Sequence, residues 1–159
     1  RVIASDERQY LDTLATLAVL EGYATALAAP HLTAEDLAEL RLLTAEMRTA
    51  VDGGDLLRFG PLNRAYHDAI YRRCPNGYLT DQIRQAWARL DSMRHSIFVL
   101  LPERARASIA DHERIADLLA SRAPAEEIEQ TVRQHKLATA AAFQARAAGA
   151  RRAVSLAAR

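Results

Sequence analysis

The sequence of 159 residues contains little cysteine, few aromatic side chains and almost no net charge. The single cysteine excludes an internal disulfide framework, and no apolar run is long enough for a membrane span or a signal-peptide core. A formal net charge of +1, from 21 basic and 20 acidic residues, gives no overall electrostatic reason to bind nucleic acid or an anionic membrane. We therefore expect a protein of the reducing cytoplasm without a membrane partner.

Apolar residues make up 50% of the sequence and recur three and four positions apart. One domain of this length can bury a core without disulfides or a structural metal. Strand-like alternation is absent, and prolines and glycines lie mostly at boundaries. The pattern predicts an all-α domain over 1–159, with six helices at about 6–29, 33–52, 55–74, 78–101, 104–121 and 124–149. The basic, alanine-rich segment 150–159 is expected to be a tail that can fray.

Three histidines lie along the apolar stripes of three different predicted helices: His67, His112 and His135. Asn63 lies one turn before His67 on the same face. Imidazole is expensive to bury without a partner, so several in one core suggest a shared partner, most simply a divalent metal. A histidine taken singly is more often a hydrogen-bonded core residue. The spacing alone leaves both interpretations open.

Other polar residues give weaker signals. Arg94 lies within the apolar stripe of the fourth predicted helix, where a guanidinium needs an anion, although it can also reach the end of the bundle or pair with a structural acid. Tyr66 and Tyr71 flank the inner face of the third helix and fit packing roles with polar tips. His31 and His95 are expected at the surface, without chemistry.

The chain contains two segments, NRAYHDAIYRRCPNGYL and SIADHERIADLLASRAPAEEIEQTVRQH, that resemble the effector-binding FCD domain of the FadR subgroup of GntR transcription regulators. The order, helix placement and spacing of the key residues all match, and the resemblance covers nearly the whole chain. The matching positions are Asn63, Tyr66, His67, Asn76, Ser108, Asp111, His112 and His135.

The resemblance implies an antiparallel bundle of six to seven helices in a cytoplasmic, homodimeric bacterial regulator. It implies a divalent metal of the zinc or nickel type that helps to hold a small organic acid. The expected metal ligands are Asn63, His67, His112 and His135. The expected effector contacts are Tyr66, Asn76, Arg94 and Ser108. Family members carry an N-terminal winged helix-turn-helix domain, so we expect DNA contact only through a domain missing from this chain.

Two positions depart from the family pattern. Metal-binding members usually supply aspartate where this chain has Asn63, whose neutral amide oxygen is a weaker ligand. We hypothesise that the undiminished +2 charge of the ion then favours an anionic carboxylate in an open coordination position. Members also often carry an arginine three residues before a Leu-Glu pair on the first helix. Here Leu17 precedes Leu20-Glu21, so one effector contact is expected to be absent.

Two alternative functions stay open. Three histidines with an open metal position also suit a small helical metalloenzyme, in which a metal-bound water is the nucleophile. Against it, no glutamate is expected on the inner faces beside the histidines, and Asp68 and Asp111 are expected to project away, so we predict no enzyme activity. The other alternative is a metal-free structural or dimerisation domain.

Overall fold

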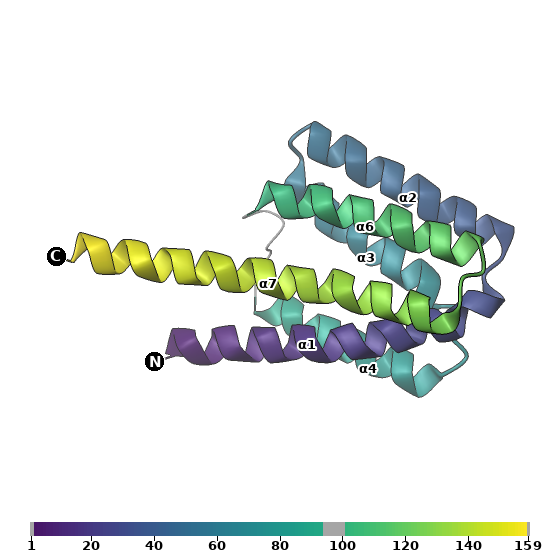
Figure 1. The fold of residues 1–159 in the computed structure, drawn as a ribbon, viewed down its shortest axis with the longest axis horizontal. Helices are drawn as coiled ribbons and strands as arrows, with labels where there is room; N and C mark the ends of the chain where they lie inside the picture. Colours follow the sequence, from purple (N-terminus) through teal and green to yellow (C-terminus); the bar gives the residue numbers. More distant parts are fainter. Residues whose placement is uncertain (1, 94–100, 159) are drawn as a thin grey trace.

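The computed structural model describes residues 2–93 and 101–158, with side chains from Asp6 onward. These residues form six α-helices and one short 3-10 helix, with no strand (Figure 1), which confirms the all-α class. The elements are α1 (Val2–Ala28), η1 (Ala29–His31), α2 (Ala34–Asp52), α3 (Leu56–Tyr71), α4 (Gly77–Ser92), α6 (Pro102–Ala120) and α7 (Ala125–Ala157).

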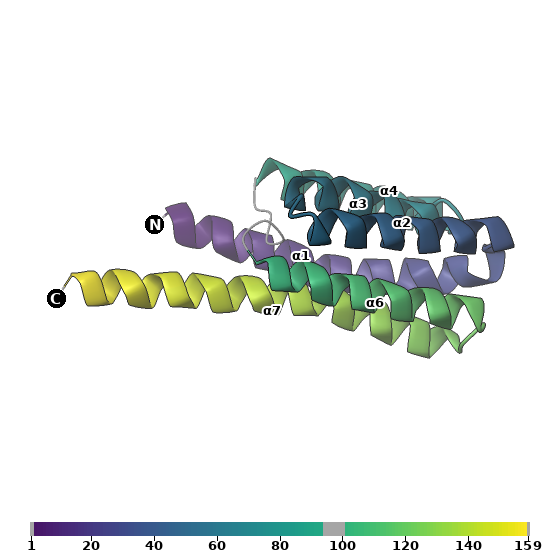
Figure 2. The ribbon, with the colours of Figure 1, turned by 90° about the horizontal axis from the view of Figure 1, so that it is seen from above.

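Successive helices run antiparallel and form one bundle (Figure 1). α1 packs along α7 and α4, α2 packs on α3 and α6, and α6 also contacts α7 and α3. Figure 2 shows α1 and α7 extending side by side beyond the other helices, so both ends of the chain lie at the same end of the molecule. This arrangement brings α3, α6 and α7, which carry the three histidines, around a common interior.

Several helix ends differ from the prediction: α1 begins at Val2, four residues earlier than expected, α3 ends at Tyr71, three residues earlier, and α4 and α7 differ by more. α4 ends at Ser92 with Met93 as its C-cap, and the predicted continuation to Leu101 falls largely outside the described residues. α7 continues to Ala157 instead of ending near Gly149, so the segment predicted as a tail is helical over 150–157. Glycine inside a helix costs about 1 kcal/mol relative to alanine, and here the alanines around Gly149, strong helix formers, offset that cost.

Every helix contributes aliphatic or aromatic side chains to one core. Burying them supplies the main driving force for folding. Core residues with almost no exposed surface include Leu14, Leu17, Leu40, Met47, Phe59, Tyr66, Ile70, Ile83, Ile115 and Ile128. None of the described helices is both long and apolar enough to cross a membrane.

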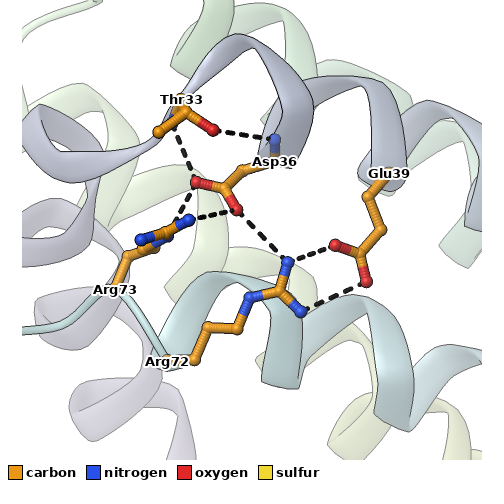
Figure 3. A network of polar contacts seen from close by, with 5 residues as sticks. All are labelled: Thr33, Asp36, Glu39, Arg72 and Arg73. Carbon is orange, nitrogen blue, oxygen red and sulfur yellow. Dashed lines mark hydrogen bonds and ion pairs between the residues drawn. The ribbon is translucent and has the colours of Figure 1, made fainter.

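A capping box fixes the start of α2. The Thr33 hydroxyl accepts from the Asp36 backbone N–H at 3.2 Å, and Asp36 Oδ2 accepts from the Thr33 N–H at 2.8 Å. Figure 3 shows that the carboxylate of Asp36 also accepts hydrogen bonds from Arg72 and Arg73, the two arginines at the end of α3. Arg73 donates from Nε and Nη2 at 2.8 and 3.1 Å, and Arg72 donates from Nη2 at 3.2 Å while also pairing with Glu39. Asp36 thus joins α2 to α3.

Asp36 is 2% exposed, and the Arg73 guanidinium beside it holds the pKa of its carboxyl well below the usual range. We predict that Asp36→Ala lowers the free energy of unfolding by about 2–4 kcal/mol, because the change removes a helix cap and leaves two arginines without their shared acceptor. Urea denaturation measures the change. Asp52→Ala, at the exposed end of the same helix, is the control and should stay within about 0.5 kcal/mol of wild type. Equal stability of the two variants would contradict this account.

Candidate metal centre

Three imidazoles from three helices converge in the interior of the bundle. His67 of α3, His112 of α6 and His135 of α7 are 2%, 0% and 5% exposed. Their ring centroids lie 4.9 to 5.6 Å apart, and one nitrogen of each ring lies within 4.8 Å of the others. The structure therefore brings together three of the four residues predicted as metal ligands.

Helical spacing adds two buried polar side chains, one turn before two of the histidines. Asn63 precedes His67 on α3, and Ser108 precedes His112 on α6, each by four residues. Among the described residues, Asn63 Oδ1, Ser108 Oγ and His112 Nδ1 are buried without a hydrogen-bond partner. Each such atom costs roughly 1–3 kcal/mol, so the interior has polar groups ready for a ligand.

The three imidazoles are held in their neutral form. Burial, reinforced by the nearby Lys136 ammonium, lowers the pKa of His67 and of His112 well below the usual value. Burial also lowers the pKa of His135, although its hydrogen bond to Asp111 opposes the shift. Because a metal binds neutral imidazole, these shifts favour metal binding at neutral pH.

Hydrogen bonds on the far side of two of the rings, those of His67 and His135, fix their orientation. His135 Nδ1 lies 2.9 Å from Asp111 Oδ2, which also accepts from Arg104 Nη2 at 3.0 Å. His67 Nδ1 lies 3.3 Å from the Tyr71 hydroxyl. The Nε2 atoms of His67 and His112 then face each other at 3.4 Å. With Nδ1 of His135 engaged, its Nε2 is the atom left for the common centre.

The expectation that Asp111 projects away from the site was wrong. The direction of a side chain was inferred from its helical angle alone, and half-buried Asp111 instead turns across to the neighbouring helix α7. Asp111 directly precedes His112 in the sequence, which could have indicated that it lies near the site. The histidine that it contacts, however, is His135 of α7.

A glutamate also lies closer to the histidines than the sequence indicated. Glu21 of α1 is fully buried, accepts from Trp87 Nε1 at 2.7 Å and pairs with Lys136 Nζ at 3.0 Å. Lys136 also lies 4.1 Å from the Trp87 ring centroid, and that ring lies 6.1 Å from the His67 ring. Sequence reasoning missed this pair because Lys136, next to His135, looks like an ordinary surface lysine.

The four residues predicted to contact an effector have different environments. Ser108 is buried one turn from His112. The Tyr66 hydroxyl donates to the His112 carbonyl at 2.7 Å, and its ring stacks on His112 at 4.2 Å, so this hydroxyl already has a partner. Asn76 is exposed and caps α4 by accepting from the Leu79 N–H at 3.0 Å. Arg94 lies outside the described residues.

Comparison with known proteins identifies the family. The sequence profile of the FCD domain matches residues 12–135. The chain belongs to the FCD domain family. A curated relative, the HTH-type transcriptional regulator McbR of Escherichia coli (strain K12), is 37% identical over 79 residues. That match covers 50% of this chain and 36% of the relative's length.

The donor set of this FCD domain fits a divalent ion. Two nitrogens bound at about 2.0–2.1 Å to a tetrahedral ion lie about 3.3–3.4 Å apart. The Nε2 atoms of His67 and His112 have this separation. The Asn63 oxygen is buried without a hydrogen-bond partner among the described residues, and the Asp111–His135 contact is the type of outer contact that orients metal-bound histidines.

Asp111 should influence metal binding without touching the metal. We predict that Asp111→Asn lowers zinc affinity by about 10- to 100-fold, because the neutral amide orients and polarises His135 less well. Competition titration with a chromophoric chelator measures the affinity. Asp68→Asn is a matched control, since exposed Asp68 also adjoins a site histidine in the sequence, and its affinity should equal that of wild type. Unchanged affinity in Asp111→Asn would rule out the orienting role.

The buried imidazoles should also make the metal-free protein sensitive to acid. Below pH of about 6.5 the unfolded chain takes up protons that the folded histidines, with their lowered pKa, do not. Stability should therefore fall as the pH drops, by up to about 1.4 kcal/mol per histidine per pH unit. Urea denaturation at pH 7.5, 6.5 and 5.5 measures this slope. His67→Gln should reduce it, and exposed His31→Gln should not.

Proposed function

We propose that this FCD domain is the effector-binding and dimerisation part of a GntR-type regulator of the FadR subgroup. A divalent metal, zinc or nickel, is held by Asn63, His67, His112 and His135, and it offers an open position to the carboxylate of a small organic acid. The domain acts in the cytoplasm as a homodimer. It affects DNA through a winged helix-turn-helix domain that is not part of residues 1–159.

The convergence of three buried imidazoles from α3, α6 and α7 carries this proposal. Tyr71 and Asp111 engage the outer nitrogens of His67 and His135, whereas the Nε2 atoms of His67 and His112 point into the common interior and lie 3.4 Å from each other. Ser108 and Asn63 add polar atoms that are buried without a partner among the described residues. The similarity to McbR, whose name describes a transcriptional regulator, supports the regulatory setting.

The mechanism follows from the distribution of the proposed metal ligands over three different helices. An effector shifts an equilibrium only by its difference in affinity for two states. Because α3, α6 and α7 each contribute a histidine, a ligand at the metal favours one relative placement of these helices. α7 packs along α1, and the two extend together to the end where the chain begins, so repacking of α7 reaches any domain attached before α1.

A metalloenzyme fits less well because the nearby carboxylates are already engaged. Asp111 is bound to His135 Nδ1 and Arg104, on the outer side of the ring, and Glu21 is bound to Trp87 and Lys136. A general base must reach the proton that it abstracts, and neither carboxylate is free to approach a metal-bound water. These contacts favour binding over turnover.

The first test is metal binding by single histidine variants. We expect the protein, purified without chelators, to bind one zinc or nickel ion, and His67→Ala or His135→Ala to abolish stoichiometric binding. His31→Ala, which removes an exposed histidine, is the control and should bind like wild type. Inductively coupled plasma mass spectrometry gives the stoichiometry. Stoichiometric metal in both site variants would contradict the proposed ligands.

The second test is ligand binding by the metal-loaded protein. A carboxylate present at about 100 times its Kd stabilises the folded state by about 2.7 kcal/mol, which corresponds to a rise in Tm of roughly 5–10 °C. We expect this rise with the metal-loaded protein and not with the metal-free protein. Hydrolysis of a test ester would support the enzyme instead, and absence of both metal and carboxylate binding would support a structural domain.

A further inference from the structure

We propose that the effector is a dianion, such as a small dicarboxylate, and that Asn63 is the residue that sets this preference. The inference rests on the proposed metal site and narrows its ligand from carboxylates in general to those with two negative charges. It follows from the charges that surround the three histidines.

Within the described part of the chain, every charged side chain that acts strongly on the imidazoles is half of an ion pair. Among the described residues, these side chains are Arg64, Arg104, Asp111 and Lys136. Lys136 Nζ pairs with Glu21 at 3.0 Å, Arg104 Nη2 with Asp111 at 3.0 Å, and Arg64 Nη2 with Asp91 at 2.8 Å. The three pairs sum to zero, and the histidines and Asn63 are neutral, so a bound divalent ion would keep its whole +2 charge.

Among the residues that the structure describes, no spare carboxylate lies near the histidines to reduce this charge. Glu21 is fully buried and holds both Trp87 Nε1 and Lys136, so turning it toward the metal would leave a buried ammonium unpaired. Asp111 already supports His135 from the outer side of the ring. Breaking a buried ion pair in this way is strongly destabilising. The two missing negative charges therefore have to arrive with the ligand.

Asn63 sets the net charge of the metal-loaded site, because it is the proposed ligand at whose position a charged side chain, aspartate, could stand instead of a neutral one. It is 3% exposed, its Oδ1 has no partner among the described residues, and it lies one turn from His67. An aspartate at this position would lower the charge of the loaded site to +1, which a monoanion balances. With asparagine, a monoanion leaves one uncompensated positive charge in a water-poor interior, and a dianion leaves none.

The test compares probes that differ by one charge at equal length. Malonate, succinate and glutarate are each paired with the corresponding monoamide, and binding to the zinc-loaded protein is measured by isothermal titration calorimetry. We expect the best dicarboxylate to bind wild type about tenfold or more tightly than its monoamide, since charges at close range in a buried site interact strongly. Asn63→Asp should reduce that ratio to about one or reverse it, and should bind zinc more tightly.

Asn63→Ala separates charge from ligation. It removes the oxygen donor without adding charge, so it should weaken zinc binding and still prefer the dianion at saturating zinc. Circular dichroism and Tm of the metal-free variants establish that each is folded. Equal affinity for both members of a pair, or a dianion preference that persists in Asn63→Asp, would overturn this inference and leave the proposed carboxylate sensor intact. Binding of none of the six probes would overturn the proposed sensor, and this inference with it.

Discussion

The site depends on one constraint, the burial of three imidazoles at a single point. Burying one imidazole is tolerable when it has a hydrogen-bond partner, but three rings with centroids within 5.6 Å compete for the few partners available. Neighbouring side chains engage the outer nitrogens of two of the rings: Asp111 contacts Nδ1 of His135, and Tyr71 contacts Nδ1 of His67. The inner nitrogens are thereby directed at each other, an arrangement that a divalent ion turns from unfavourable to favourable.

The contacts around the histidines tie this centre to the framework of the bundle. Glu21 on α1 binds Trp87 on α4 and Lys136 on α7, and Lys136 directly follows His135. At Gly22, the next residue of α1, the helices α1 and α7 lie close together, since an added Cβ would lie 2.8 Å from the Glu129 carbonyl oxygen. A change at the proposed metal site would therefore act on helices that are in direct contact, and α1 and α7 lead to the end of the molecule where both termini lie.

The sequence predicts the fold well because helical periodicity and caps are local signals. The Thr33 and Asp36 box and the inward positions of Asn63, His67, His112 and His135 follow from spacing along single helices. The Asp111–His135 and Glu21–Lys136 contacts each join two helices, and spacing within one helix carries no information about its neighbour. For the same reason Asn76, which matches the family pattern, could not be recognised beforehand as an exposed cap of α4. The length of α7 was underestimated because a single glycine was given more weight than the alanines around it.

The central claim is that His67, His112 and His135 bind one metal ion through their inner nitrogens. Anomalous diffraction at the zinc absorption edge, from crystals of zinc-loaded protein, tests this most directly. The account predicts one anomalous peak inside the bundle, bonded to Nε2 of all three histidines at about 2.0–2.1 Å, with a coordination position open to solvent or a carboxylate. A histidine cluster with no anomalous peak, in crystals that hold zinc only at surface positions, would contradict it.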